Sequence, residues 1–222
     1  MTDDATTGYL APPRPAGMPG VLLLHSWWGL DDGVRDLCER LAEAKFAALA
    51  PDLLEGALPA NEAEAEATLA AVSPEVLARR VMLSIDVLRQ RIGRRTGPIA
   101  IVGFAMGASM GLWAAARRPT AISTVVGYYG SQSLDFDDVE AEVLLHFAEQ
   151  DDLVSEEDRV TTEALLRMGG VEVEAVTHPG TVHGFAEPSN AAYQAEAADR
   201  AWDQTIALLR RRLRPFDLPT VS

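Results

Sequence analysis

Short apolar runs alternate with segments of helical periodicity from residue 21 onward, and this alternation is the feature that most restricts the fold. Each run is too short for a typical helix, and most are flanked by glycine, proline or charged residues. Such an alternation is typical of a mostly parallel sheet with helices on both faces. The runs predict six strands, at Val21–His25, Ala47–Pro51, Ile99–Gly103, Ile122–Tyr128, Val143–Phe147 and Val171–Val176.

The segments between these runs carry recognisable helix starts. Ser73-Pro74-Glu75 combines a cap residue, a proline and an acidic first turn, and Asn190 precedes the amphipathic stretch AAYQAEAADRAWDQTIALLRRRL. The Ala- and Glu-rich segment 61–72 predicts a surface helix or a lid segment. We find no internal repeat and no linker, so we expect one domain spanning residues 1–222.

The chain is strongly acidic, with a formal net charge of −14 and a pI of about 4.6. An acidic surface repels phosphate backbones and anionic lipid headgroups, so we expect neither a nucleic-acid nor a membrane partner. The first twenty residues lack a basic segment followed by an apolar core, and no run approaches the length of a membrane span. These features, together with the single cysteine, lead us to expect a cytoplasmic protein.

The segment PIAIVGFAMGASMGLWAAARR predicts a buried strand, a tight corner and a helix, which is the local geometry of a nucleophile elbow. Gly103 and Gly107 stand two residues before and two residues after Ala105. Glycines at these places let the backbone turn sharply and present the central side chain at the carboxyl edge of the sheet. Ala105 therefore has the position of a nucleophile and no functional group. The same pattern also fits an ordinary strand-turn-helix junction.

Two later segments supply the groups that normally act with an elbow nucleophile. Asp151 follows the apolar run at 143–147, and His183 follows the last predicted strand. A Ser or Cys hydrolase of this kind needs an acid and then a histidine, in that order. Asp151 would orient and polarise His183, which would act as general base and then as general acid. Asp152 is the alternative acid, and motif register alone favours Asp151.

Three further histidines compete with His183. His146 lies inside a predicted strand and His178 ends one, so both are interpreted as structural histidines with satisfied hydrogen bonds. His25 is expected to brace the loop beside it.

Cys38 is interpreted as a core thiol, because Val34, Leu37 and Leu41 share its helical face. The sequence has no H-E-x-x-H motif, no histidine pair at i, i+4 and no cysteine cluster, so we expect no metal site. The GxGxxG and GxxxxGK[ST] patterns are also missing, and we expect no bound cofactor.

Taken together, these segments resemble the dienelactone hydrolase family over nearly the whole chain. The resemblance rests on GYLAPP, VLLLHSWWGL, FAALAPDLLEG, GFAMGA, YYG, HFAEQDDLV and HPGTVHGF. It implies an α/β-hydrolase fold with a mostly parallel central sheet of about six to eight strands, and action on a small-molecule ester or lactone. By position, the triad falls on Ala105, Asp151 and His183, with oxyanion-hole amides from Trp27 and Met106.

Two further positions depart from the family pattern. Members with a cysteine nucleophile carry a glutamate where this chain has Ser26, which indicates a serine-type or altered relative. Glu187 corresponds to the family's arginine that helps to hold a carboxylated lactone, so an anionic dienelactone is disfavoured as substrate. The candidate substrate-binding residues are Ser26, Trp28, Phe104 and Phe185. Ser26 could equally bond only to backbone, and the Trp27–Trp28 pair could instead cap the core.

Three functional hypotheses remain open. The chain is a lactone or ester hydrolase inactivated at Ala105, a non-covalent enzyme that uses His183 as general base in a hydration, isomerisation or cyclisation, or a catalytically dead binder of a small ligand or a protein. The sequence does not name the substrate. A monomer is the expected state, as the resemblance implies, and the apolar content of the last predicted helix leaves a dimer open.

Overall fold

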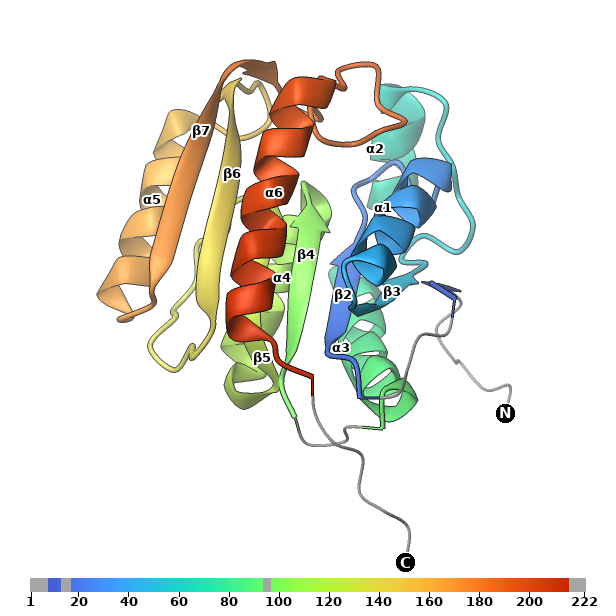
Figure 1. Ribbon diagram of the computed structural model, residues 1–222. Coiled ribbons are helices and arrows are strands. Elements are labelled where there is room, and N and C mark those ends of the chain that lie inside the picture. Colours follow the sequence, from blue (N-terminus) through green and yellow to red (C-terminus); the bar gives the residue numbers. More distant parts are fainter. Residues whose placement is uncertain (1–7, 13–16, 94–96, 216–222) are drawn as a thin grey trace, which may run out of the picture.

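The structure is a computed structural model that describes residues 8–12, 17–93 and 97–215 (Figure 1). Its strands form one seven-stranded sheet in the order β1-β3-β2-β4-β5-β6-β7. All neighbouring strands are parallel except β1 and β3, which are antiparallel. The predicted mostly parallel sheet is therefore confirmed. The strands are β1 (Gly8–Leu10), β2 (Gly20–Leu24), β3 (Ala47–Pro51), β4 (Ile99–Phe104), β5 (Ile122–Tyr128), β6 (Glu142–Gln150) and β7 (Val173–Val182).

The six predicted strands correspond to β2 through β7, with two corrections. β7 continues to Val182, well past the predicted end at Val176, so His178 lies inside the strand and does not end it. The extension follows from pairing with β6, which resumes beyond an irregularity and reaches Gln150 opposite Val182. β1 was not predicted, because three partly exposed residues at the sheet edge give no apolar run to recognise.

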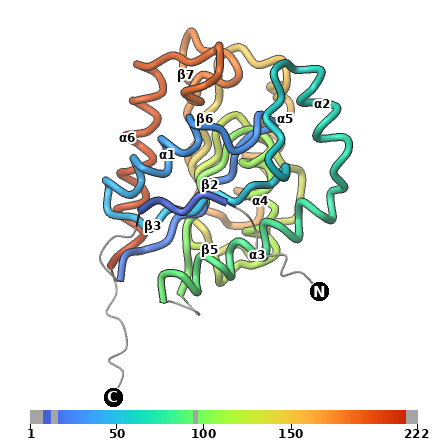
Figure 2. The backbone as a smooth tube through the Cα atoms, turned by 90° about the vertical axis from the view of Figure 1, so that its right-hand side faces the viewer, coloured from blue at the N-terminus to red at the C-terminus, as the bar shows by residue number. Residues whose placement is uncertain are grey.

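Helices cover both faces of the sheet, as predicted. In Figure 2, α1 and α6 lie on one side of the sheet, and α3, α4 and α5 lie on the other. Each layer buries its own apolar core against the strands. α2 lies near the edge at which the parallel strands end (Figure 1). The helices are α1 (Asp32–Glu43), α2 (Glu62–Ala70), α3 (Pro74–Arg91), α4 (Met106–Arg117), α5 (Glu156–Met168) and α6 (Ala195–Arg212).

Local capping signals placed one helix start correctly, at Ser73, and one wrongly, at Asn190, whereas the helix in segment 61–72 was predicted from its Ala and Glu content. Ser73 and Asn61 are the N-cap residues of α3 and α2, and each side chain accepts a backbone N–H of its helix. α6, however, begins at Ala195 and not after Asn190. The amide oxygen of Asn190 accepts the N–H of Ala192 at 2.9 Å, which holds the preceding residues in turns.

Two apolar segments are accounted for by packing within the chain. Cys38 is fully buried on α1, as predicted for a core thiol, and burial raises its pKa to about 12. The apolar side chains of α6, including Trp202 and Leu209, are buried in the same core. None of the described helices is both long and apolar enough to cross a membrane.

Candidate active site

The corner between β4 and α4 has the predicted strand-turn-helix form. Ala105 occupies it with φ 47° and ψ −113°, a conformation that L-residues seldom adopt. The corner is closely packed, because a Cβ on Gly107 would lie 2.7 Å from the carbonyl oxygen of His25. A Cβ on Gly130 would likewise lie 2.8 Å from the carbonyl oxygen of Ala105. Glycine at both places lets the end of β4 approach its neighbours.

Met106 is the first residue of α4, directly after this corner. The first N–H groups of a helix have no partner within the helix and lie at the positive end of its dipole. Trp27 and Trp28 lie in the loop after β2, with their rings 5.8 Å apart in an edge-to-face arrangement. The oxyanion-hole role of the Trp27 and Met106 amides stays a prediction.

Asp151 and His183 meet at the carboxyl ends of β6 and β7. The Nδ1 atom of His183 lies 2.9 and 3.0 Å from the two carboxylate oxygens of Asp151. The Asp151 side chain is fully buried and that of His183 is 17% exposed. The backbone N–H groups of Leu153 and Val154 also donate to Asp151, at 3.0 and 2.9 Å.

Several effects act on the acidity of Asp151. Burial raises the pKa of Asp151, but the hydrogen bond and charge attraction of His183 and the two backbone amides outweigh it, so the net pKa is lowered. An ionised Asp151 holds the Nδ1 proton and leaves Nε2 of His183 free for chemistry. The neighbouring Asp152 does not share this position, since the contact to His183 comes from Asp151.

A second buried group of polar side chains lies beside His183 and was not predicted. Ser26 donates a hydrogen bond of 2.5 Å to one carboxylate oxygen of Glu187, and the Tyr129 hydroxyl donates one of 3.1 Å to the other. The Tyr129 ring centroid lies 4.7 Å from that of His183. Burial raises the pKa of Glu187 to about 7, although both hydrogen bonds oppose the increase. Burial also raises the pKa of Tyr129 well above its ordinary value, so its hydroxyl is a neutral donor.

Only part of this group had a signal in the sequence. Tyr129 directly follows the strand predicted at 122–128, and residues at the carboxyl ends of parallel strands meet at the site edge. Glu187 was considered only as the counterpart of the family's arginine. Its partner Ser26 lies 161 residues earlier in the chain, and no local sequence pattern indicates a contact between residues so far apart.

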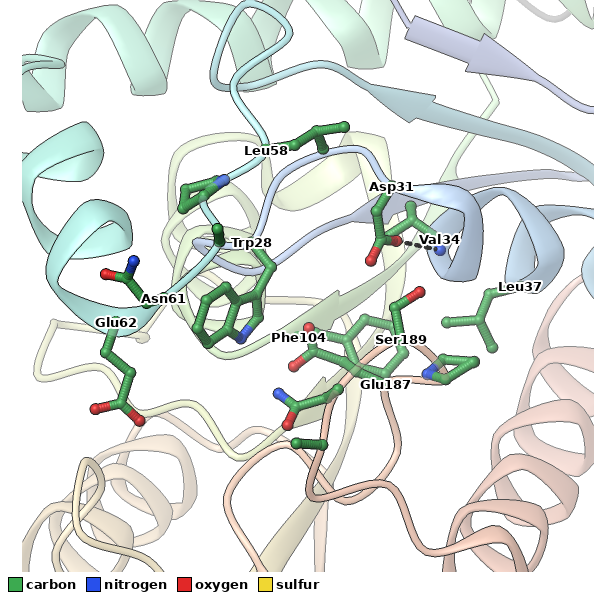
Figure 3. Close-up of a pocket in the computed structure, with 15 residues that line it drawn as sticks. Trp28, Asp31, Val34, Leu37, Leu58, Asn61, Glu62, Phe104, Glu187 and Ser189 are labelled. Atoms are coloured by element: carbon green, nitrogen blue, oxygen red, sulfur yellow. Dashed lines mark hydrogen bonds between the residues drawn. The ribbon is translucent and has the colours of Figure 1, made fainter.

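A cavity of about 490 Å³ opens beside this group, and Trp28, Phe104 and Glu187 line it (Figure 3). Of the predicted substrate-binding residues, Trp28 and Phe104 line this cavity and Ser26 is bonded to its lining residue Glu187. Their role in substrate binding stays a prediction. Phe185 is fully buried and packs against Tyr129, so the structure does not bring it to this cavity. Among the described residues, neither Ala105 nor His183 belongs to the lining, which adjoins the elbow through Phe104.

The remaining histidines serve the structure. The Nδ1 atom of His25 lies 2.6 Å from the Ser26 carbonyl oxygen, so His25 braces the loop beside it as predicted. Its Nε2 also accepts the N–H of Leu53 at 3.0 Å, a second contact that was not predicted. His146 and His178 contact each other at 3.0 Å through ring nitrogens, and burial lowers the pKa of His146 to about 3. In the part of the chain that the structure describes, no three His, Cys, Asp or Glu side chains are grouped to hold a metal ion.

The mostly parallel sheet between two helical layers, with a sharp turn after β4 and an Asp–His pair at the ends of β6 and β7, defines an α/β-hydrolase fold. Residues 6–213 match the dienelactone hydrolase family, and the chain belongs to that family.

Individual relatives can be aligned with this chain over almost its full length. "Protein usf" of Aquifex pyrophilus is 27% identical over 93% of each chain. A "Putative carboxymethylenebutenolidase" of Aquifex aeolicus is 24% identical over 93% of this chain and 94% of the relative. The solved structure of a "Putative Dienelactone Hydrolase from Klebsiella pneumoniae" has a TM-score of 0.80 and 21% identity, with 90% of each chain covered. At that identity the structural likeness concerns the fold.

Proposed function

We propose that the chain is a lactone or ester hydrolase scaffold in which Ala105 stands at the nucleophile position and prevents covalent catalysis. The observation that carries the proposal is the bonded Asp151–His183 pair at the sheet edge where the β4–α4 corner presents Ala105. His183 packs on Tyr129, and the N–H of Ala105 bonds to the carbonyl oxygen of the adjacent Tyr128, which brings the two parts together. The name of the Aquifex aeolicus relative supports a lactone as the substrate class.

The geometry fits a covalent mechanism once a nucleophile is restored. A serine at position 105 would lose its proton to Nε2 of His183 as its oxygen attacks the substrate carbonyl, and Asp151 would stabilise the imidazolium. The backbone amides of Met106 and Trp27 would hold the oxyanion. His183 would then protonate the leaving alcohol, and a water would release the acid by the same steps in reverse. Without the nucleophile, binding and the oxyanion hole retain a residual rate of roughly 10³ to 10⁴ over water.

The test compares the chain as written with Ala105→Ser and Ala105→Cys on short-chain nitrophenyl esters and simple lactones. We expect burst kinetics in at least one variant and only residual turnover in the chain as written. His183→Ala in the Ala105→Ser background is the control and should remove the gain. No gain with any ester or lactone, in variants that fold normally, would overturn the proposal.

A second candidate is a non-covalent enzyme in which His183 and Glu187 move protons on a bound substrate or water. One observation favours it: the Glu187 carboxyl borders the cavity and has a pKa of about 7, where it can both give and accept a proton. Such an enzyme would be active with the unaltered sequence, and the His183→Ala variant would be inactive. Turnover seen only after Ala105→Ser would exclude it.

A further inference from the structure

The cavity beside the elbow combines an aromatic side chain with carboxylates. The partly exposed Trp28 supplies the aromatic surface, since Phe104 also lines the cavity but is only 1% exposed. Asp31, Glu62 and Glu187 supply carboxyl groups. Among the described residues, the lining contains no lysine, arginine or histidine. Trp28 lies in the middle of the view in Figure 3, between Asn61 and Phe104. An aromatic face next to an anionic group is the usual setting in which proteins bind an organic cation.

The three carboxyl groups differ in what they can contribute. Glu62 is exposed at the start of α2, where water screens its charge. Asp31 caps α1, with one oxygen accepting the N–H of Val34 at 2.8 Å. Glu187 is only 7% exposed, and its two oxygens accept hydrogen bonds from neutral hydroxyl groups. The least screened negative charge at the cavity wall is therefore that of Glu187.

Glu187 is a buried acid without a countercharge. Within the described part of the chain, no ion pair to Glu187 lies within 4.0 Å. Charged side chains that are buried in proteins are ordinarily paired, because desolvation is costly. His183 favours the ionised form of Glu187 through its charge and Asp31 disfavours it, and burial outweighs both. A cation brought by a ligand would supply the pairing that the fold leaves open.

We propose that the cavity binds the cationic end of an ester or lactone that carries an alkylammonium group, and that Glu187 is the residue that selects it. The inference rests on the proposed hydrolytic function and names its substrate class. The ammonium group would lie against Trp28 and near Glu187, while the acyl group extends past Phe104 toward the elbow. A substrate with a carboxylate at the same place would meet like charge in a partly desolvated wall and would be rejected.

The kinetic test uses the Ala105→Ser variant and a pair of esters of equal shape. Butyrylcholine carries a quaternary ammonium group, and 3,3-dimethylbutyl butyrate replaces it with a neutral tert-butyl group. Assays at pH 8.5 keep Glu187 ionised, since burial raises its pKa only to about 7. We expect kcat/KM to favour butyrylcholine, and Glu187→Gln to lower the preference by roughly tenfold or more, mainly through KM.

Two further variants separate a local effect from a general one. Glu66→Gln removes an exposed carboxyl on α2 that is not part of the cavity lining, and it should leave the preference unchanged. Trp28→Leu keeps Glu187 and removes the indole face, and it should also lower the preference. If Glu187→Gln does not fold, the effect of Trp28→Leu on the preference for butyrylcholine tests the inference. Turnover of the neutral ester with no preference for the cation, or a preference that neither substitution changes, would overturn the inference and leave the hydrolytic proposal intact.

If Ala105→Ser hydrolyses no ester, the hydrolytic proposal fails and binding to the chain as written decides the inference. Calorimetry would compare choline with its neutral counterpart 3,3-dimethylbutanol, in the chain as written and in Glu187→Gln. Tighter binding of choline that is lost in Glu187→Gln supports a cation site. Equal or undetectable binding of the two probes overturns it.

Discussion

Replacing Glu187 by glutamine should remove a pH-dependent loss of stability. Burial raises the pKa of Glu187 from its ordinary value of 4.5 to about 7 in the folded chain. Between these values the folded chain keeps the proton while the unfolded chain releases it. The folded state is therefore favoured below about pH 4.5, loses stability as the pH rises toward 7, and carries a constant cost above that. Glutamine has no proton to lose and avoids this cost.

The size of the effect follows from the two pKa values. At about 1.4 kcal/mol per pKa unit, the difference between 4.5 and about 7 amounts to about 3 kcal/mol at pH 8.5 and less than about 1 kcal/mol at pH 5. The substitution also alters the hydrogen bonds with Ser26 and Tyr129, which adds an offset that does not depend on pH. The quantity to measure is therefore the change between the two pH values, and we expect it to favour Glu187→Gln by about 2 to 3 kcal/mol.

Urea unfolding followed by tryptophan fluorescence at constant ionic strength gives the free energies at both pH values. Glu66→Gln is the matched control, because it removes a carboxyl group from the exposed side of α2. We expect that control to change the free energy of unfolding by less than about 0.5 kcal/mol at either pH. A Glu187→Gln variant whose stability follows the same pH dependence as the parent chain would refute the reasoning.

Two further predictions concern the active site. In the Ala105→Ser background, Asp151→Asn should lower kcat by about 10³ to 10⁴, because an asparagine no longer holds His183 in the reactive tautomer. Steady-state kinetics with a nitrophenyl ester measures this change. An unchanged kcat would show that Asp151 has no part in the mechanism. Gly107→Ala should lower the free energy of unfolding by about 2 to 4 kcal/mol, because its Cβ would press on backbone at Leu24 and His25. Urea unfolding measures it against Gly111→Ala, whose Cβ would meet only side-chain atoms, the nearest 3.0 Å away, and equal losses would contradict the packing argument.

The parts of the fold that the sequence determined by itself depend on neighbouring residues. Five of the six predicted strands match the structure to within a few residues, because apolar runs bounded by glycine, proline or charge need no distant partner. Ser73 placed the start of α3 because a cap bonds to an amide three residues away. The Ala and Glu content of segment 61–72 predicted α2, because helix propensity is a property of each residue. The spacing of Gly103 and Gly107 around Ala105 placed the β4–α4 corner in the same way.

Other features depend on residues that only the folded chain brings together. β1 exists because it pairs with β3, and β7 extends past residue 176 because β6 offers backbone partners there. α6 starts at Ala195 and not at the predicted place after Asn190, because the Asn190 side chain bonds within its own turn. In each case a non-local or competing hydrogen bond overrides a local preference.

The candidate site likewise has one part that the sequence predicts and another that depends on the tertiary structure. Asp151 and His183 could be predicted, because each follows a recognisable strand and parallel strands end at one edge. The contact of Glu187 with Ser26 and Tyr129 could not, because their segments lie far apart in the chain and meet only at the sheet edge. The sequence shows that Glu187 is an acid, whereas its pKa of about 7 and its place at the cavity depend on burial, which is a property of the tertiary structure.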